Sequence, residues 1–211
     1  MSAQSYVSIP TYSRHSKPAT GEDGFFAQTL STPITIPSVR TLRLIHLQSP
    51  LPSQPPSWPS PTDPPHPIPV PGADLLMVLQ LASPGVCGHP DTAHGGVLAT
   101  LIDEAMSLGV TLYAPEAGEQ FNPDTSPAPE AGGGSEPAFR GRIRSKMFTA
   151  QLDVRYKRPV SVPGEVEVRV QVLAKQGKKV WVRAQVVQCG EIMVDAMAFW
   201  LLTSPSVKSV L

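Results

Sequence analysis

Cysteine is scarce in this sequence, and its scarcity excludes two classes of protein. The chain has 211 residues and two cysteines, Cys87 and Cys189. That number excludes both a fold held together by several disulfides and a zinc module built on four cysteines. One bond between the pair stays open from the sequence, while a reduced intracellular chain is the simpler interpretation.

Charge and long apolar runs are scarce as well. Charged residues make up 16% of the chain, and 17 basic residues balance 17 acidic ones. Because a protein that grips nucleic acid normally carries a strongly basic surface, we expect no nucleic-acid partner. The sequence has no run of about 18 apolar residues, so it predicts no transmembrane helix.

The first residues lack the apolar core of a secretory signal peptide. Residues 1–20 are rich in Ser and Thr and carry Arg14, His15 and Lys17. This composition gives a faint likeness to a mitochondrial transit peptide. We expect residues 1–23 to be a disordered tail of a cytoplasmic protein, with mitochondrial import as the alternative.

Proline, by contrast, is abundant, with 25 in the chain and 11 of them among residues 50–71. Proline removes backbone donors, so this segment cannot be a helix or a central strand. A surface insertion is favoured over a ligand for an SH3- or WW-type partner. Residues 114–146 carry a triple glycine and little apolar content, and we interpret them as a flexible loop or lid. We therefore expect one domain over residues 24–203, followed by a tail at residues 204–211.

Alternating apolar and polar residues near the end of the chain predict antiparallel strands. Four consecutive segments show this or a continuous apolar pattern, namely residues 150–157, 165–172, 179–186 and 192–202. Gly-containing pairs between them predict turns. The pattern of residues 74–82 predicts a fifth strand, and that of residues 24–47 predicts a short helix and a turn. On the first of the four strands, Thr149 falls on the polar face with Gln151.

A helix is predicted over residues 94–113. Its apolar residues cover one face and most of a second, which is typical of a helix buried nearly all round. Asp103 projects from the second face, where a carboxylate is costly unless it is paired or used. The fold class is therefore α+β, a curved antiparallel sheet wrapped around one long central helix.

The start of this helix is a candidate anion site. His94 is followed by Gly95 and Gly96, whose N–H groups lie at the positive end of the helix dipole. Such donors suit an oxyanion or a phosphate. The alternative is a plain tight turn into the helix, capped by Asp91 or Thr92.

Two interpretations also stay open for Asp103 on the helix. It is a general base or nucleophile near those donors, or it forms a buried ion pair with an arginine.

Two other clusters of polar residues are candidate sites. Cys87, His89, Asp91 and His94 match no common zinc spacing, so we expect no metal and a loop that positions His94. A basic rim suits the phosphates of a nucleotide-bearing substrate, with a solvated sheet edge as the alternative. Its members are Arg155, Lys157, Arg158, Lys175, Lys178 and Lys179.

The segments HGGVLATLIDEAM, TAQLDVRYKRPV and DAMAFWLL, in this order, resemble the hotdog-fold acyl-CoA thioesterases. Within them, the sequence is most similar to the phenylacetyl-CoA thioesterase-like group, including its proline-rich fungal members. The resemblance covers about residues 74–203 and implies an obligate homodimer, or a tetramer, with sites at the subunit interface.

The resemblance also implies a role for each site residue. Gly95, in the motif with His94 and Gly96, polarises the thioester carbonyl through its N–H. Asp103 activates water or attacks the carbonyl, and Thr149 places the water from across a subunit interface. Coenzyme A is contacted by residues of the expected basic rim, namely Arg155, Lys157, Lys175, Lys178 and Lys179.

The function expected from these residues is hydrolysis of acyl-CoA to a carboxylic acid and CoA, without a cofactor or metal. Two alternatives stay open. One is a non-catalytic acyl-CoA-binding hotdog module, and the other is a hydrolase of acyl chains bound to a carrier protein. The resemblance to the family does not choose an acyl chain.

Overall fold

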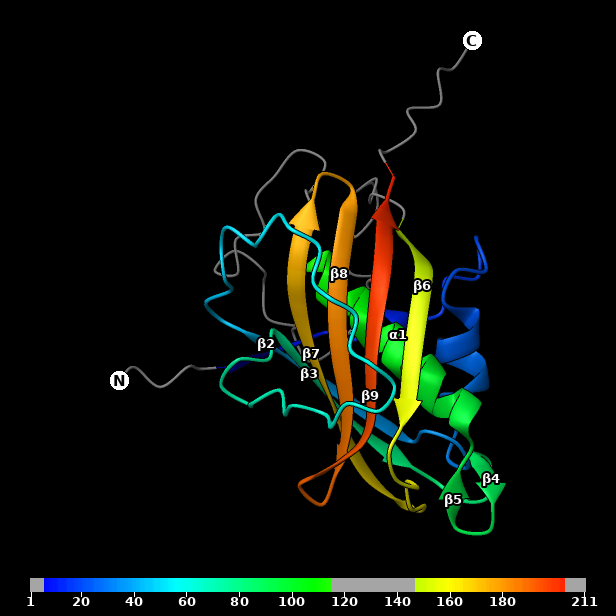
Figure 1. Ribbon diagram of the computed structural model, residues 1–211. Coiled ribbons are helices and arrows are strands. Elements are labelled where there is room, and N and C mark those ends of the chain that lie inside the picture. Colours follow the sequence, from blue (N-terminus) through cyan, green and yellow to red (C-terminus); the bar gives the residue numbers. More distant parts are fainter. Residues whose placement is uncertain (1–5, 115–146, 204–211) are drawn as a thin grey trace.

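The computed structural model describes residues 6–114 and 147–203, which form one antiparallel sheet of seven strands and one long helix (Figure 1). The strand order in the sheet is β1-β2-β3-β7-β8-β9-β6. The strands are β1 (Tyr6–Ile9), β2 (Ser38–Leu44), β3 (Leu75–Leu81), β6 (Met147–Tyr156), β7 (Gly164–Gln176), β8 (Lys179–Gln188) and β9 (Glu191–Leu202). The long helix is α1 (Gly95–Thr111), preceded by the small hairpin β4 (Cys87–His89) and β5 (Thr92–Ala93).

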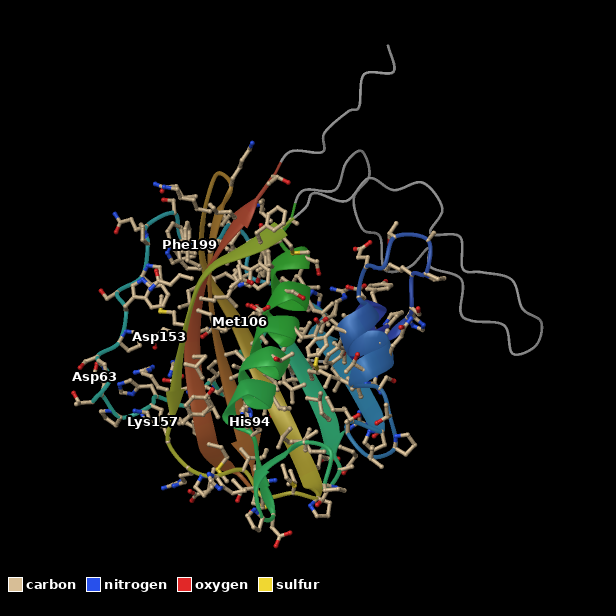
Figure 2. The ribbon with its side chains drawn as sticks, turned by 90° about the vertical axis from the view of Figure 1, so that its right-hand side faces the viewer. Asp63, His94, Met106, Asp153, Lys157 and Phe199 are labelled. Carbon is tan, nitrogen blue, oxygen red and sulfur yellow. The ribbon has the colours of Figure 1, made fainter. Side chains whose placement is uncertain are left out.

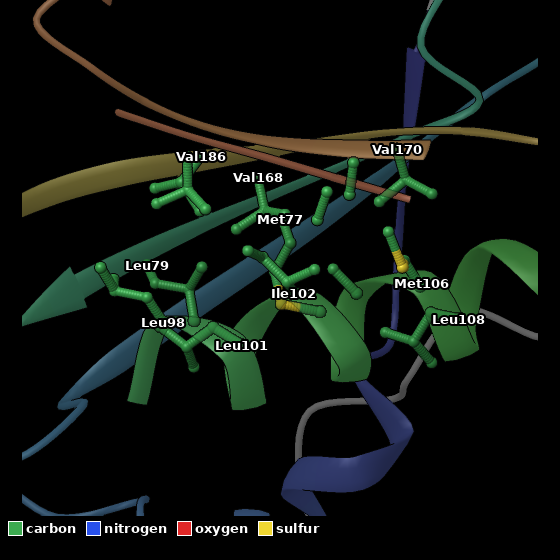
Figure 3. Packing of buried hydrophobic residues seen from close by; sticks show 14 of the residues in the cluster. Met77, Leu79, Leu98, Leu101, Ile102, Met106, Leu108, Val168, Val170 and Val186 are labelled. Carbon is green, nitrogen blue, oxygen red and sulfur yellow. The ribbon is translucent and has the colours of Figure 1, made fainter. Parts of the chain in front are cut away.

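Helix α1 lies across one face of the sheet and contacts β3, β6, β7, β8 and β9. Its residues Leu101, Ile102 and Met106 are fully buried against the valines of β7 and β8 (Figure 3). Each such side chain contributes about 1.5–3 kcal/mol to folding. The expected α+β architecture, with the sheet curved around one helix, is confirmed.

Gly109 lets the helix approach the sheet closely near its C-terminal end. A Cβ atom at this position would lie 2.7 Å from Cγ1 of Val170 on β7. The helix therefore carries a residue of low helix propensity where the packing leaves no room for a methyl group.

The N-terminal region differs from the expectation. Residues 6–9 pair with β2 rather than belonging to a disordered tail, and residues 38–44 form a strand where a turn was expected. Strand β1 has four residues, too few to show a period, and Thr and Arg interrupt the apolar alternation of β2. Between them lie the short helices η1 (Tyr12–Arg14) and η2 (Phe25–Thr29).

Arg14 shows what holds this N-terminal region in place. Its guanidinium donates to the carbonyl of Ile36 at 2.8 Å and lies 5.6 Å from the centre of the Phe26 ring. The Arg14 side chain, interpreted above as part of a possible transit peptide, thus connects η1 to η2.

Residues 50–71, here called the proline-rich strap, cross the face of the sheet away from α1 (Figure 1). The strap has no regular structure, because proline cannot donate to a strand ladder. Its carbonyls accept instead: Arg183 donates to the carbonyl of His66 at 2.6 Å. Trp58 packs on the outward-facing side chains of Trp181 and Met197. Strands β8 and β9 are consequently buried on both faces.

The expected loop at residues 114–146, from its second residue onward, and the expected tail at 204–211 lie outside the described residues.

Candidate active site

The first turn of α1 is built around two glycines and a histidine. His94 is the N-cap, and its Nδ1 accepts a hydrogen bond from the N–H of Gly96 at 3.0 Å, so neither Asp91 nor Thr92 caps the helix. Within the described residues, the N–H of Gly95 has no hydrogen-bond partner. An unpaired donor at the positive end of a helix dipole is suited to stabilising an oxyanion.

A pocket of about 520 Å³ opens beside this first turn. Lys157 and His94 lie at this same end of the molecule (Figure 2). The pocket is lined by His89, Ala93, Gly95, Leu98, Tyr156, Lys157, Arg158, Pro159 and Val160. Glycine, aromatic, apolar and basic groups therefore surround one cavity at the helix N-terminus.

Asp103 and Thr149 form the second part of the candidate site. The Thr149 hydroxyl donates to Oδ1 of Asp103 at 2.7 Å. Burial raises the pKa of the Asp103 carboxyl, and the hydrogen bond from Thr149 partly opposes this. Among the described residues, no arginine pairs with Asp103, and Arg140, Arg142 and Arg144 lie outside them.

A β-bulge in β6 brings Thr149 to this position. Thr149 lies opposite Trp200 of β9 and Gln151 lies opposite Phe199, which leaves Ala150 as an extra residue. Trp200 belongs to the core beside α1, whereas Phe199 packs on the outer face. The expectation that Thr149 shares a face with Gln151 is therefore wrong, because one extra residue reverses the alternation.

The two parts of the site are separate within one chain. Asp103 follows Gly95 by eight residues on the same helix. At a rise of 1.5 Å per residue, their backbones are about 12 Å apart along the helix axis. A ligand atom within hydrogen-bond distance of the Gly95 N–H is thus out of reach of Asp103 of the same chain.

The Asp103–Thr149 contact also lies inside one chain, whereas the resemblance implied that it crosses a subunit interface.

Lys157 lies at the pocket, but the strap holds its ammonium group. The Nζ atom donates to the carbonyls of Pro61 and Asp63, both at 3.2 Å. Figure 2 shows Lys157 and Asp63 on the same side of the molecule. An incoming phosphate would therefore compete with two neutral carbonyl acceptors for this lysine.

Arg155 is buried beneath the strap and faces away from the pocket. It pairs with Asp195, which is fully buried, and donates to the carbonyl of Ser60 at 3.0 Å. Arg183 also pairs with Asp195, at 3.0 Å. The structure thus places Arg155 in an internal ion-pair network and does not bring it to the candidate site.

The three remaining lysines of the expected basic rim lie at the other end of the sheet. Lys175, Lys178 and Lys179 surround the β7–β8 turn, whereas the pocket lies beside the start of β7. Strand β7 has 13 residues, which separates these ends by about 40 Å. Lys175 donates to the carbonyl of Tyr113, close to the C-terminal end of α1.

Tyr156 is a candidate site residue that the sequence patterns did not indicate. Its hydroxyl donates to the carbonyl of Gly95 at 2.7 Å, and its ring borders the pocket. Alternation placed it only on the apolar face of its strand. Its position in the YKRP segment, directly before two basic residues, was the available signal.

The described residues contain no group of three or more His, Cys, Asp or Glu side chains that could hold a metal ion. Within the same residues, none of the helices is long and apolar enough to span a membrane.

A known family model matches the part of the chain that contains Gly95, Asp103, Thr149 and Tyr156. Residues 91–194 match the family model described as the Thioesterase superfamily. This segment belongs to the thioesterase superfamily. It contains α1 and most of β6 to β9, so the resemblance drawn from the sequence is confirmed at the level of the family.

Solved structures similar to this chain are distant. A Bacillus halodurans protein with CoA is 18% identical over 60% of this chain and 66% of that chain, with a TM-score of 0.44. A hypothetical thioesterase of Streptococcus pneumoniae with coenzyme A is 13% identical over 62% and 79%, with a TM-score of 0.45. The E. coli PaaI protein from the phenylacetic acid degradation operon is 10% identical over 62% and 73%, with a TM-score of 0.45. No curated protein matches the sequence significantly.

Proposed function

We propose that this protein hydrolyses acyl-CoA thioesters, and that its active site combines Gly95 of one chain with Asp103 and Thr149 of a second copy. One observation carries the proposal. Asp103, which accepts a hydrogen bond from the Thr149 hydroxyl, and Gly95, whose N–H is unpaired among the described residues, lie about 12 Å apart on the same helix. Membership of residues 91–194 in the thioesterase superfamily supports the reaction type.

The edge strand β6 supports the arrangement of the two copies. It is the last strand of the sheet, and it runs from Thr149 beside Asp103 to Tyr156 beside Gly95. An antiparallel pairing of two β6 strands would place the Thr149 end of one copy next to the Tyr156 end of the other. Each Asp103 would then approach the Gly95 of the other copy.

In the proposed reaction, the thioester carbonyl oxygen accepts from the Gly95 N–H. Asp103 takes a proton from water while the water oxygen bonds to the carbonyl carbon. Collapse of the tetrahedral oxyanion breaks the C–S bond, and the proton passes to the sulfur, which leaves as the CoA thiol. The remaining product is the carboxylic acid. Burial makes Asp103 a stronger base by raising its pKa.

The first test measures thiol release from acyl-CoA esters of short, long and aromatic chains. Asp103→Asn is expected to lower kcat by about 10²–10⁴, since it removes the base and keeps the shape. Glu104→Gln is the matched control, because Glu104 is the next residue on α1 and burial also raises its pKa. A folded wild type that hydrolyses no ester would contradict the proposal, and so would full activity in Asp103→Asn.

A second test asks whether the site is shared between two chains. Asp103→Asn and Gly95→Pro are each purified, mixed, dissociated and reassembled. Random pairing restores one intact site in the mixed dimers, so activity returns to about a quarter of the wild-type level. If the mixture stays as inactive as its parents while wild type treated in the same way recovers, the shared site is wrong.

The two alternative functions predict different results in these assays. A binding module would take up acyl-CoA without releasing thiol. A hydrolase of carrier-bound chains would prefer acyl groups on a carrier protein over the same groups on CoA.

A further inference from the structure

We propose that Tyr156 is a positioning residue that holds the first turn of α1 so that the Gly95 N–H stays fixed. This inference rests on the function proposed above. It concerns the peptide unit that joins Gly95 to Gly96, which directly follows the unit that carries the Gly95 N–H. Two consecutive glycines have the widest range of backbone angles of any residue pair, so the turn that carries the donor lacks intrinsic stiffness.

Both polar atoms of this peptide unit have a side-chain partner. The Gly95 carbonyl accepts from the Tyr156 hydroxyl at 2.7 Å. The Gly96 N–H donates to Nδ1 of His94 at 3.0 Å. A peptide plane that is bonded at its oxygen and at its nitrogen cannot rotate without breaking one of the two bonds. The side chains thus supply the rigidity that the glycine backbone lacks.

The tyrosine ring adds a steric restraint. A Cβ atom built on Gly95 would lie 3.3 Å from Cζ of Tyr156 and 3.4 Å from Cε1 and the hydroxyl oxygen. The ring therefore lies directly against the Gly95 backbone and forms a wall of the pocket. The Tyr156 hydroxyl is protonated at neutral pH, as in any tyrosine, and partial burial raises its pKa further.

The position of Tyr156 in the sheet explains why it reaches the helix. Beyond the bulge at Ala150, β6 alternates regularly, and Tyr156 lies opposite Val194, whose side chain is in the core beside α1. It is the last residue of β6. Tyr156 thus ties the helix start to the strand that we place at the dimer interface.

The test compares Tyr156→Phe with wild type and with a matched control. Tyr6→Phe makes the same chemical change at β1, where the Tyr6 hydroxyl donates to the backbone carbonyl of Ala73 at 2.8 Å, remote from the site. For Tyr156→Phe we expect kcat to fall about tenfold with KM within about twofold, because the loss affects orientation rather than binding. For Tyr6→Phe both constants are expected to stay at the wild-type values.

A double variant distinguishes positioning from a general structural role. Gly95→Pro removes the N–H that Tyr156 is proposed to hold in place. In that background, Tyr156→Phe is expected to change kcat by less than about twofold, because the two changes act through the same donor. A full tenfold loss in both backgrounds would overturn the positioning role.

The remaining outcomes separate this inference from the proposed function. Wild-type hydrolysis with an unchanged kcat in Tyr156→Phe overturns the role of Tyr156 and leaves the thioesterase proposal standing. A wild type without hydrolysis overturns both.

Discussion

Replacing Gly95 by proline removes one hydrogen-bond donor and adds side-chain atoms next to the Tyr156 ring. Gly95 is the first helical residue, where proline is well tolerated because the N–H has no partner within the helix. His94 precedes it in an extended conformation, with φ −65° and ψ 132°, as a residue before proline requires. The N–H that is lost bonds to none of the described residues, so the fold loses no internal hydrogen bond there.

The expected effect on catalysis is large. Loss of one preorganised oxyanion donor typically costs about 2.7–4 kcal/mol in the transition state, which corresponds to about 10²–10³ in kcat. Gly95→Ala is the steric control, because it adds the same Cβ at 3.3 Å from the Tyr156 ring and keeps the N–H. We expect Gly95→Ala to be at least about tenfold more active than Gly95→Pro.

The assay is thiol release from the best acyl-CoA ester, with kcat and KM determined separately. Thermal unfolding of each variant checks that the fold is intact. Equal activity of the proline and alanine variants, both folded, would refute the assignment of Gly95 as the oxyanion donor. If that shared activity lies well below wild type, the loss comes from crowding against the tyrosine ring.

Three further predictions concern the base, the ion pair under the strap and the helix packing. Thr149→Val removes the hydrogen bond that lowers the pKa of Asp103, so this pKa rises further and the acid limb of the kcat–pH profile moves to higher pH; an unmoved limb would contradict the role of the pair. Asp195→Ala leaves two guanidinium groups without their carboxylate beneath the strap and should cost about 3–5 kcal/mol in urea unfolding, whereas a loss below about 1 kcal/mol would mean that the network is worth little. Gly109→Ala forces a methyl group to within 2.7 Å of Val170 and should lower the stability measured in the same way by about 1–3 kcal/mol; a stabilised variant would show that helix propensity outweighs packing here.

The parts of the fold that sequence reasoning predicted are those with a local period. Strands β7, β8 and β9 show their burial in alternation or in a continuous apolar run, and α1 shows it at helical spacing. Strands β1 and β2 could not be predicted from the sequence. Their stability comes from pairing with neighbouring strands, and their four and seven residues show no regular apolar pattern.

The basic residues were the least predictable part of the site. A basic residue on a predicted polar face has the same sequence appearance whether it meets solvent, a ligand or a buried carboxylate. Arg155 was expected at coenzyme A, and the strap covers it instead, because residues 50–71 fold back over the sheet from far along the chain. Lys175, Lys178 and Lys179 were grouped with Lys157, although the length of β7 separates them from it.

A helix that starts with two glycines and carries Asp103 on a buried face can be predicted from the amino-acid sequence, because helical period and glycine chemistry act over a few residues. The partners of these groups depend on the tertiary structure. One extra residue in β6 turns Thr149 toward Asp103, and the end of the same strand places Tyr156 on Gly95. Register and strand order depend on contacts between distant segments, so no local pattern encodes them.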